Sequence, residues 1–165
     1  MTQMVMPNDT NPLGNLMGGN LLRWMDIASG ICAGKHAGSV VVTVSADSVL
    51  FKHPIKEGDV LTIVAKVTCA FTTSMEVHIE VFKESFANPK KIKCNEAYFS
   101  FVALNEEGRP QSVPPVLPIT EKEEKQCRAA QRRREMRLVL AGRLKPQNAK
   151  ELQSIFLEET DLKDH

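Results

Sequence analysis

Several features that would define other classes of protein are scarce in this chain of 165 residues. Aromatic residues make up only 5% of it, so a core must be built mainly from aliphatic side chains and methionine. No apolar run approaches the roughly 18–20 residues that cross a bilayer, and the first eight residues lack a basic segment followed by an apolar one. We therefore expect neither a membrane span nor a secretory signal peptide.

Charge and cysteine content are equally unremarkable. The formal net charge is +1, which gives no reason to expect a nucleic-acid partner. The four cysteines lie far apart and form no C-x-x-C pair, so neither a zinc site nor a disulfide framework is expected: Cys32, Cys69, Cys94 and Cys127. This spacing is typical of scattered thiols in a reducing compartment, and we predict a cytoplasmic location.

The periodic apolar pattern ends at a proline-rich stretch, Val113–Pro118, which fits neither a helix interior nor a central strand. We predict a core domain over residues 1–118 and a C-terminal helical extension over residues 119–165. In the extension, Ile119–Lys145 is expected to form one helix with Thr120 as its N-cap and acidic residues in its first turn.

One helix and four strands are expected in the core domain. Gly19–His36 is apolar on almost every side, so such a helix must be wrapped by other elements. Four segments enriched in β-branched residues follow it: Val40–Phe51, Val60–Phe71, Met75–Glu84 and Lys93–Leu104. The order predicts an α+β fold in which an antiparallel sheet curls around a long central helix.

The segment before the helix is the richest in candidate site residues. After a run of turn residues, Gly18 and Gly19 would allow a ligand to approach the backbone, and the N–H groups of the first helical turn could stabilise an oxyanion. Asp26 follows Gly19 by two helical turns and is the one acid in an otherwise apolar helix. It is a candidate general base or nucleophile, although a cap for the glycines and an ion pair for the aspartate are the plainer interpretations.

Other patterns leave the choice open. Thr72–Met75 is either a hairpin turn or a place where hydroxyl groups lie beside a ligand, and Asn11 alone would be a turn residue. The arginines that follow residue 130 form either a solvated helix face, the more common case, or a phosphate site. The chain has no Gly-x-Ser-x-Gly elbow, no nucleophilic Cys/His pairing and no metal-ligand spacing, so no metal and no cofactor is expected.

Taken together, these motifs resemble the hotdog-fold acyl-CoA thioesterases, in particular the bacterial short- and medium-chain acyl-CoA hydrolases and the brain-type acyl-CoA hydrolases. The resemblance extends over about Met4–Pro118 and is carried by four stretches in the order of the family: Met6–Asp26, Phe51–Asp59, Thr73–Met75 and Phe101–Pro110. The first contains Met-Pro-x-Asp-Thr-Asn, then Gly-Gly, then Met-Asp. Each stretch alone is weakly specific, whereas the four in sequence are quite specific.

The resemblance implies hydrolysis of acyl-CoA to free fatty acid and CoA, within lipid metabolism and with CoA as part of the substrate. It also implies homo-oligomers, in which two domains join edge to edge into one sheet and three such dimers form a hexamer. Asp26 would be the catalytic aspartate and Asn11 its paired asparagine from the opposite protomer. The expected substrate-binding residues are Met17, Gly18, Gly19, Thr73, Ser74 and Met75.

Two other functions fit parts of the pattern. Hotdog enoyl-CoA hydratases carry Asp-x-Asn-Pro-x-His, but the last position of that signature is Gly14 here, which removes the imidazole. A regulator that binds acyl-CoA without hydrolysing it is the second alternative, and it would bind ligand without releasing a free thiol.

Overall fold

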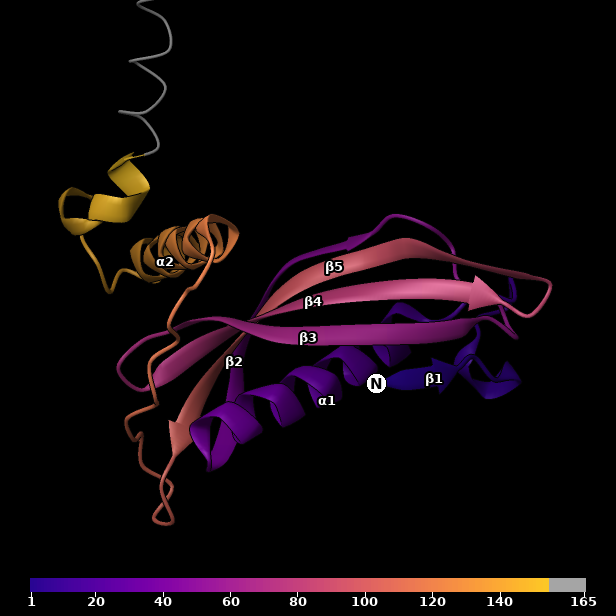
Figure 1. Ribbon diagram of the computed structural model, residues 1–165, viewed down its shortest axis with the longest axis horizontal. Helices are drawn as coiled ribbons and strands as arrows, with labels where there is room; N and C mark the ends of the chain where they lie inside the picture. Colours follow the sequence, from indigo (N-terminus) through magenta and orange to yellow (C-terminus); the bar gives the residue numbers. More distant parts are fainter. Residues whose placement is uncertain (155–165) are drawn as a thin grey trace, which may run out of the picture. The chain divides into compact units, whose positions relative to one another are not determined.

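The computed structural model describes residues 1–154, which divide into two compact units, Met1–Pro115 and a second unit that begins at Val116 (Figure 1). The end of the predicted extension, residues 155–165, lies outside the described residues. The predicted division at residue 118 stays a prediction.

The first unit is a five-stranded antiparallel sheet with a long helix, α1 (Gly18–Ala37), lying along one face (Figure 1). The strands follow the spatial order β1-β3-β4-β5-β2 and have these bounds: β1 Thr2–Met4, β2 Val40–Phe51, β3 Val60–Ala70, β4 Ser74–Ser85 and β5 Asn88–Leu104. This arrangement confirms the predicted α+β class and the antiparallel sheet packed on a helix.

The hydrophobic core lies between α1 and the inner face of the sheet. Because side chains alternate across a strand, every second residue from Met75 to Val81 faces α1, and all four of these are fully buried: Met75, Val77, Ile79 and Val81. The helix contributes Leu21, Trp24 and Met25 to the same core. Aliphatic side chains and methionine dominate this layer, as the low aromatic content led us to expect.

The expectation that α1 is wrapped on all sides is only half met. Ile27 is 42% exposed and Ile31 is 53% exposed, because the sheet covers one side of the helix only. The neighbouring strand β2 is at the edge of the sheet, where it pairs with β5 alone, and it exposes Val40, Val42 and Val44. An apolar helix face and a free strand edge therefore lie in the same part of this unit.

Two irregularities interrupt β2. The register with β5 shifts between Thr43 and Ser45 and again between Asp47 and Leu50. Ser48, within the second shift, has a φ of 55°, a left-handed backbone conformation that residues other than glycine rarely adopt. Such bulges bend a strand and increase its twist.

Element boundaries differ from the prediction in three places. The three residues of β1 are too few to show a pattern, and β5 begins five residues earlier than expected, at Asn88. In the second unit, α2 (Glu121–Leu140) is followed by a short 3-10 helix, η2 (Pro146–Asn148). The Thr120 cap is confirmed, because its hydroxyl accepts the N–H of Glu123. None of the described helices is long and apolar enough to cross a membrane.

Candidate active site

The loop that precedes α1 folds back against the first turn of that helix. The carbonyl of Asp9 accepts hydrogen bonds from the Met17 N–H at 2.9 Å and from Asn20 Nδ2 at 3.2 Å. Asp9 also lies in a short 3-10 helix, η1 (Pro7–Asp9), where its carboxylate accepts the N–H of Met6 at 3.0 Å. Four residues are thus fixed around the helix start.

Asn11 organises the turn within this loop. Its Oδ1 accepts the N–H groups of Leu13 at 2.9 Å and Asn15 at 3.2 Å. In a single chain the residue therefore has the turn role that its type suggests. These bonds engage the amide oxygen, which leaves the Nδ2 group as the atom through which Asn11 could act on a ligand.

Gly18 and Gly19 form the first turn of α1, with Met17 as the N-cap. The N–H groups of a first helical turn have no acceptor within the helix, so they are available to an incoming oxygen. A β-carbon on Gly18 would lie 3.2 Å from Cζ of Phe51, whereas a β-carbon on Gly19 would meet nothing within 4 Å. The ring of Phe51 therefore packs directly on the backbone of Gly18.

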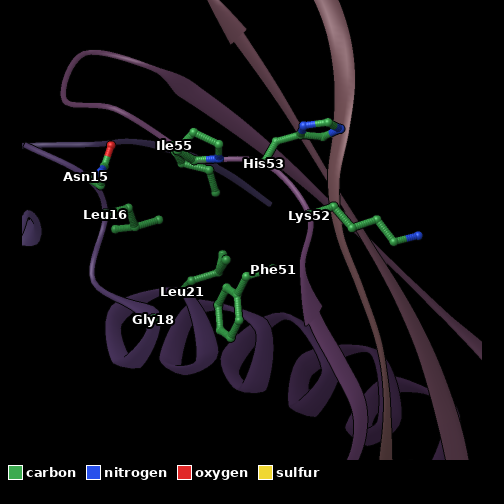
Figure 2. Close-up of a pocket in the computed structure, with 9 residues that line it drawn as sticks. Asn15, Leu16, Gly18, Leu21, Phe51, Lys52, His53 and Ile55 are labelled. Atoms are coloured by element: carbon green, nitrogen blue, oxygen red, sulfur yellow. The ribbon is translucent and has the colours of Figure 1, made fainter.

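A pocket of about 400 Å³ opens beside this glycine (Figure 2). It is lined by Asn15, Leu16, Gly18, Leu21, Phe51, Lys52, His53, Pro54 and Ile55. In Figure 2, Leu16, Leu21 and Ile55 surround the space and Lys52 extends away from it. The wall is thus largely apolar, with basic groups at its margin, which is typical of a pocket for an apolar ligand.

Asp26 lies further along α1 and pairs with a residue that the sequence did not indicate. Its Oδ1 accepts the hydroxyl of Thr43 on β2 at 2.6 Å. Asp26 is half-buried and Thr43 is exposed, so the carboxylate lies at the open β2 edge of this unit rather than deep in the core. Thr43 belongs to a valine-rich strand segment, and only the packing of β2 beside α1 brings its hydroxyl to the carboxylate.

The predicted site residues fall into separate groups in one chain. Asp26 lies eight positions after Gly18 in the helix, a distance of about 12 Å along the axis. Thr73 lies in the turn between β3 and β4, and Ser74 is the first residue of β4; both are at the end of β3 away from the pocket, roughly 30 Å along the strand. Met75 is fully buried in the core and does not line the pocket.

One cluster among the described residues has the geometry of a metal site. His78, Glu80 and Glu96 each offer a ligand atom within 4.8 Å of the others. The ammonium group of Lys93 already lies among them, 2.6 Å from Glu80 Oε1 and 3.1 Å from Glu96 Oε2. The cluster is therefore an ion-pair network in which a lysine supplies the positive charge.

This network shifts two pKa values in opposite directions. Partial burial alone would raise the pKa of Glu96, but hydrogen bonds from His78 and Lys93 outweigh it and lower that pKa below its ordinary value. For Lys93 the signs are reversed: partial burial alone would lower its pKa, but its hydrogen bonds to the two glutamates outweigh burial and raise that pKa. Both shifts favour the charged forms, as in a structural ion pair.

The free thiols give no alternative nucleophile. Burial raises the pKa of Cys32 and of Cys94 above the ordinary value of a thiol. Since the thiolate is the reactive form, both groups are poor nucleophiles at neutral pH.

A long helix packed along one face of an antiparallel sheet is the fold that this chain shares with the hotdog-fold thioesterases. The model of the Thioesterase superfamily matches residues 13–87. A solved apo-hexameric acyl-CoA thioesterase is 39% identical, with a TM-score of 0.80 over 86% of this chain and 90% of that one. The chain belongs to the Thioesterase superfamily.

Two further relatives define the extent of the likeness. Acyl-coenzyme A thioesterase 11 of Mus musculus is 41% identical over 88% of this chain, and the chain spans about a quarter of the length of this and related rodent thioesterases. An acyl-CoA hydrolase from Staphylococcus aureus, solved with butyryl coenzyme A and coenzyme A, is 35% identical. Its TM-score is 0.73 over 99% of this chain and 91% of that one.

The Staphylococcus aureus hydrolase has also been solved with alanine in place of an asparagine, an aspartate and a threonine. Those three residues are separated by 15 and then 17 residues. The same residue types stand at the same spacing here as Asn11, Asp26 and Thr43. The spacing thus singles out the threonine that sequence reasoning missed together with the two residues that it selected.

Proposed function

We propose that this chain hydrolyses acyl-CoA to a free fatty acid and CoA, with Asp26 as general base or nucleophile. The observation that carries the proposal is the Asp26 carboxylate, held at 2.6 Å by Thr43 on the open β2 edge of the sheet. Both residues recur, by type and spacing, among those substituted in the Staphylococcus aureus hydrolase. CoA is part of the substrate, and the reaction as proposed uses no separate cofactor or metal.

The chemistry requires an activated oxygen nucleophile and a site for negative charge on the thioester oxygen. With Asp26 as base, water attacks the acyl carbon and its proton passes to the carboxylate. The C–S bond then breaks, and the proton goes on to the CoA thiolate. General-base catalysis contributes about 10²–10⁴-fold to such a step, and one oxyanion donor contributes about 10²–10³-fold. The N–H groups of Gly18 and Gly19 are the proposed oxyanion donors.

A second protomer is needed to assemble these parts. Along α1, Asp26 is about 12 Å from Gly18, whereas a base and an oxyanion donor must both lie within roughly 3 Å of the reacting atoms. The apolar face formed by Ile27 and Ile31 and the free edge of β2 support a dimer in which the two sheets continue into one. Asp26 of one protomer would then face Asn11 and the glycine pair of the other.

Larger assembly and cellular context extend the same proposal. A trimer of such dimers is supported by the hexameric state named for two solved relatives. In such an assembly Thr73 and Ser74, far from the pocket in their own chain, would contact CoA bound to another protomer. We propose a cytoplasmic enzyme of lipid metabolism, with no nucleic-acid or membrane partner.

Thiol release from a panel of acyl-CoAs of graded chain length tests the function. The purified chain is expected to release CoA, and Asp26→Ala is expected to lose at least about 100-fold in kcat/KM while keeping its fold and oligomeric state. A folded Asp26→Ala variant with unchanged turnover would contradict the assignment of Asp26. Tight binding with no thiol release would favour a regulator instead.

A further inference from the structure

A buried amide without hydrogen-bonding partners lies in β5. Asn95 is 0% exposed, and neither its Nδ2 nor its Oδ1 has a partner among the described residues. Burying such a group unpaired costs free energy, so native proteins nearly always supply a partner from the chain, from water or from a ligand. The amide therefore has an unused donor and an unused acceptor.

The position of Asn95 places it behind the wall of the pocket. It lies directly opposite Phe51 on β2 and Val81 on β4, so the three side chains share one face of the sheet. Val81 belongs to the core that packs on α1, which identifies this face as the inner one. In addition, the N–H of Lys52 bonds to the carbonyl of Cys94 at 3.1 Å. The pocket-lining segment and the buried amide are thus adjacent.

The immediate neighbours cannot satisfy the amide. Phe51 and Val81 are hydrocarbon side chains, and the thiol of Cys94 donates instead to the carbonyl of Val81 at 3.4 Å. An unsubstituted acyl chain in the pocket would leave both atoms of the amide unpaired as well. A hydroxyl group both donates and accepts, so one hydroxyl on an acyl chain can pair with Oδ1 and Nδ2 together.

Phe51 separates the pocket from the amide. Its ring rests on the backbone of Gly18 (Figure 2), yet the residue is 57% exposed at the end of an edge strand. In the single chain the core does not enclose the ring, so other rotamers of Phe51 are sterically open to it. An acyl group in the pocket would reach Asn95 only after the Phe51 ring has rotated, because Asn95 itself does not line the pocket.

We propose that Asn95 is a specificity-determining residue that selects acyl groups carrying a hydroxyl over the matching unsubstituted groups. The inference rests on the proposed acyl-CoA hydrolysis, because it names the substrate class of that same pocket. It assigns to Asn95 a contact with the acyl group and no part in the chemical step.

The test compares 3-hydroxybutyryl-CoA with butyryl-CoA. For the unaltered protein we expect kcat/KM to favour the hydroxylated substrate by about tenfold, the value of one additional hydrogen-bonded group. Asn95→Leu keeps the volume but removes the donor and acceptor, so this preference should disappear. Calorimetric binding of both CoA esters gives the same ratio without relying on turnover.

Ser100→Ala is the matched control. Ser100 is also buried in β5, and its Oγ has no hydrogen-bond partner among the described residues. Its side chain lies on the opposite face of the sheet from Asn95, beside Glu76 of β4 in the strand register. The variant should leave the substrate ratio unchanged.

A ratio near one in both turnover and binding for the unaltered protein overturns the inference, whether or not Asn95→Leu folds. So does an Asn95→Leu variant that is more stable and keeps the preference, since an internal water would then be the partner. Absence of hydrolysis with any acyl-CoA refutes the proposed function separately, and the binding ratio still decides the role of Asn95.

Discussion

Mixing two inactive variants is expected to restore activity, because each proposed site takes Asp26 from one protomer and Asn11 from the other. Asp26→Ala protomers still carry Asn11, and Asn11→Ala protomers still carry Asp26. A dimer with one protomer of each kind therefore has one site with both residues intact and one site that lacks both. Neither variant alone can form an intact site.

The size of the recovery follows from the two-fold symmetry. If equal amounts of the two variants exchange at random, about half of the dimers are mixed, and one of the two sites in each mixed dimer is intact. About a quarter of the sites should then work, so the mixture should recover about 25% of the unaltered activity. The same value holds if these dimers assemble further into hexamers.

The assay is thiol release after the two variants are unfolded together and refolded, with separately refolded variants as controls. Each variant alone should retain about 1% or less of the activity if the lost residue contributes at least a hundredfold. A refolded mixture no more active than its components, with mixed dimers verified by differently tagged chains, would refute the two-protomer site. It would indicate that each protomer completes its own site.

Three further predictions concern single residues. Thr43→Val removes the hydroxyl that holds the carboxylate at 2.6 Å, and kcat/KM should fall about tenfold, the equivalent of one hydrogen bond of about 1.4 kcal/mol. Gly18→Ala places a methyl group 3.2 Å from the Phe51 ring. It should change the free energy of unfolding by less than about 1 kcal/mol but lower turnover at least about tenfold, by obstructing the oxyanion site. Because the pKa of Glu96 is lowered from 4.5 in the folded state, its ion pairs stabilise the protein above pH 4.5, and that stability is lost as the pH falls below this value. On acidification, the free energy of unfolding of Glu96→Gln should fall by about 0.5–1 kcal/mol less than that of the unaltered protein.

Matched controls exist for the first two of these. The hydroxyl of Thr62 on β3 has no hydrogen bond within the described chain, so Thr62→Val should leave turnover unchanged. The methyl group added in Gly19→Ala has no neighbour within 4 Å. This variant therefore isolates the stability gain of alanine in a helix, about 0.5–1 kcal/mol. Turnover of Gly18→Ala equal to that of the unaltered protein would exclude an oxyanion site at this glycine. An identical acid profile for Glu96→Gln would show that the ion-pair network adds no stability.

The sequence predicted the parts of this protein that depend on local periodicity. The enrichment in β-branched residues marked β2, and the continuous apolar run marked α1, because both patterns extend over many residues. It could not reveal Thr43, since that hydroxyl reaches Asp26 only after a strand and a helix have packed side by side. Met75 is a different case: the resemblance placed it among the substrate-binding residues, whereas it shares the strand face of Val77 and Ile79 and is buried in the core.

The pocket lay beyond prediction for a related reason. Phe51 and Leu21 come from distant segments, and their shared contact with the space beside Gly18 exists only in three dimensions. The buried amide of Asn95 was equally hidden, because an asparagine in a strand is far more often exposed at an edge.

The two bulges in β2 limit how this protein can associate with itself. A long, straight and apolar strand edge can recruit one chain after another, which is how fibrils grow. The bend after Thr43 and the left-handed residue at position 48 interrupt that edge, so a ladder of hydrogen bonds across it remains short. The proposed dimer through β2 would therefore be a finite contact rather than the first step of a fibril.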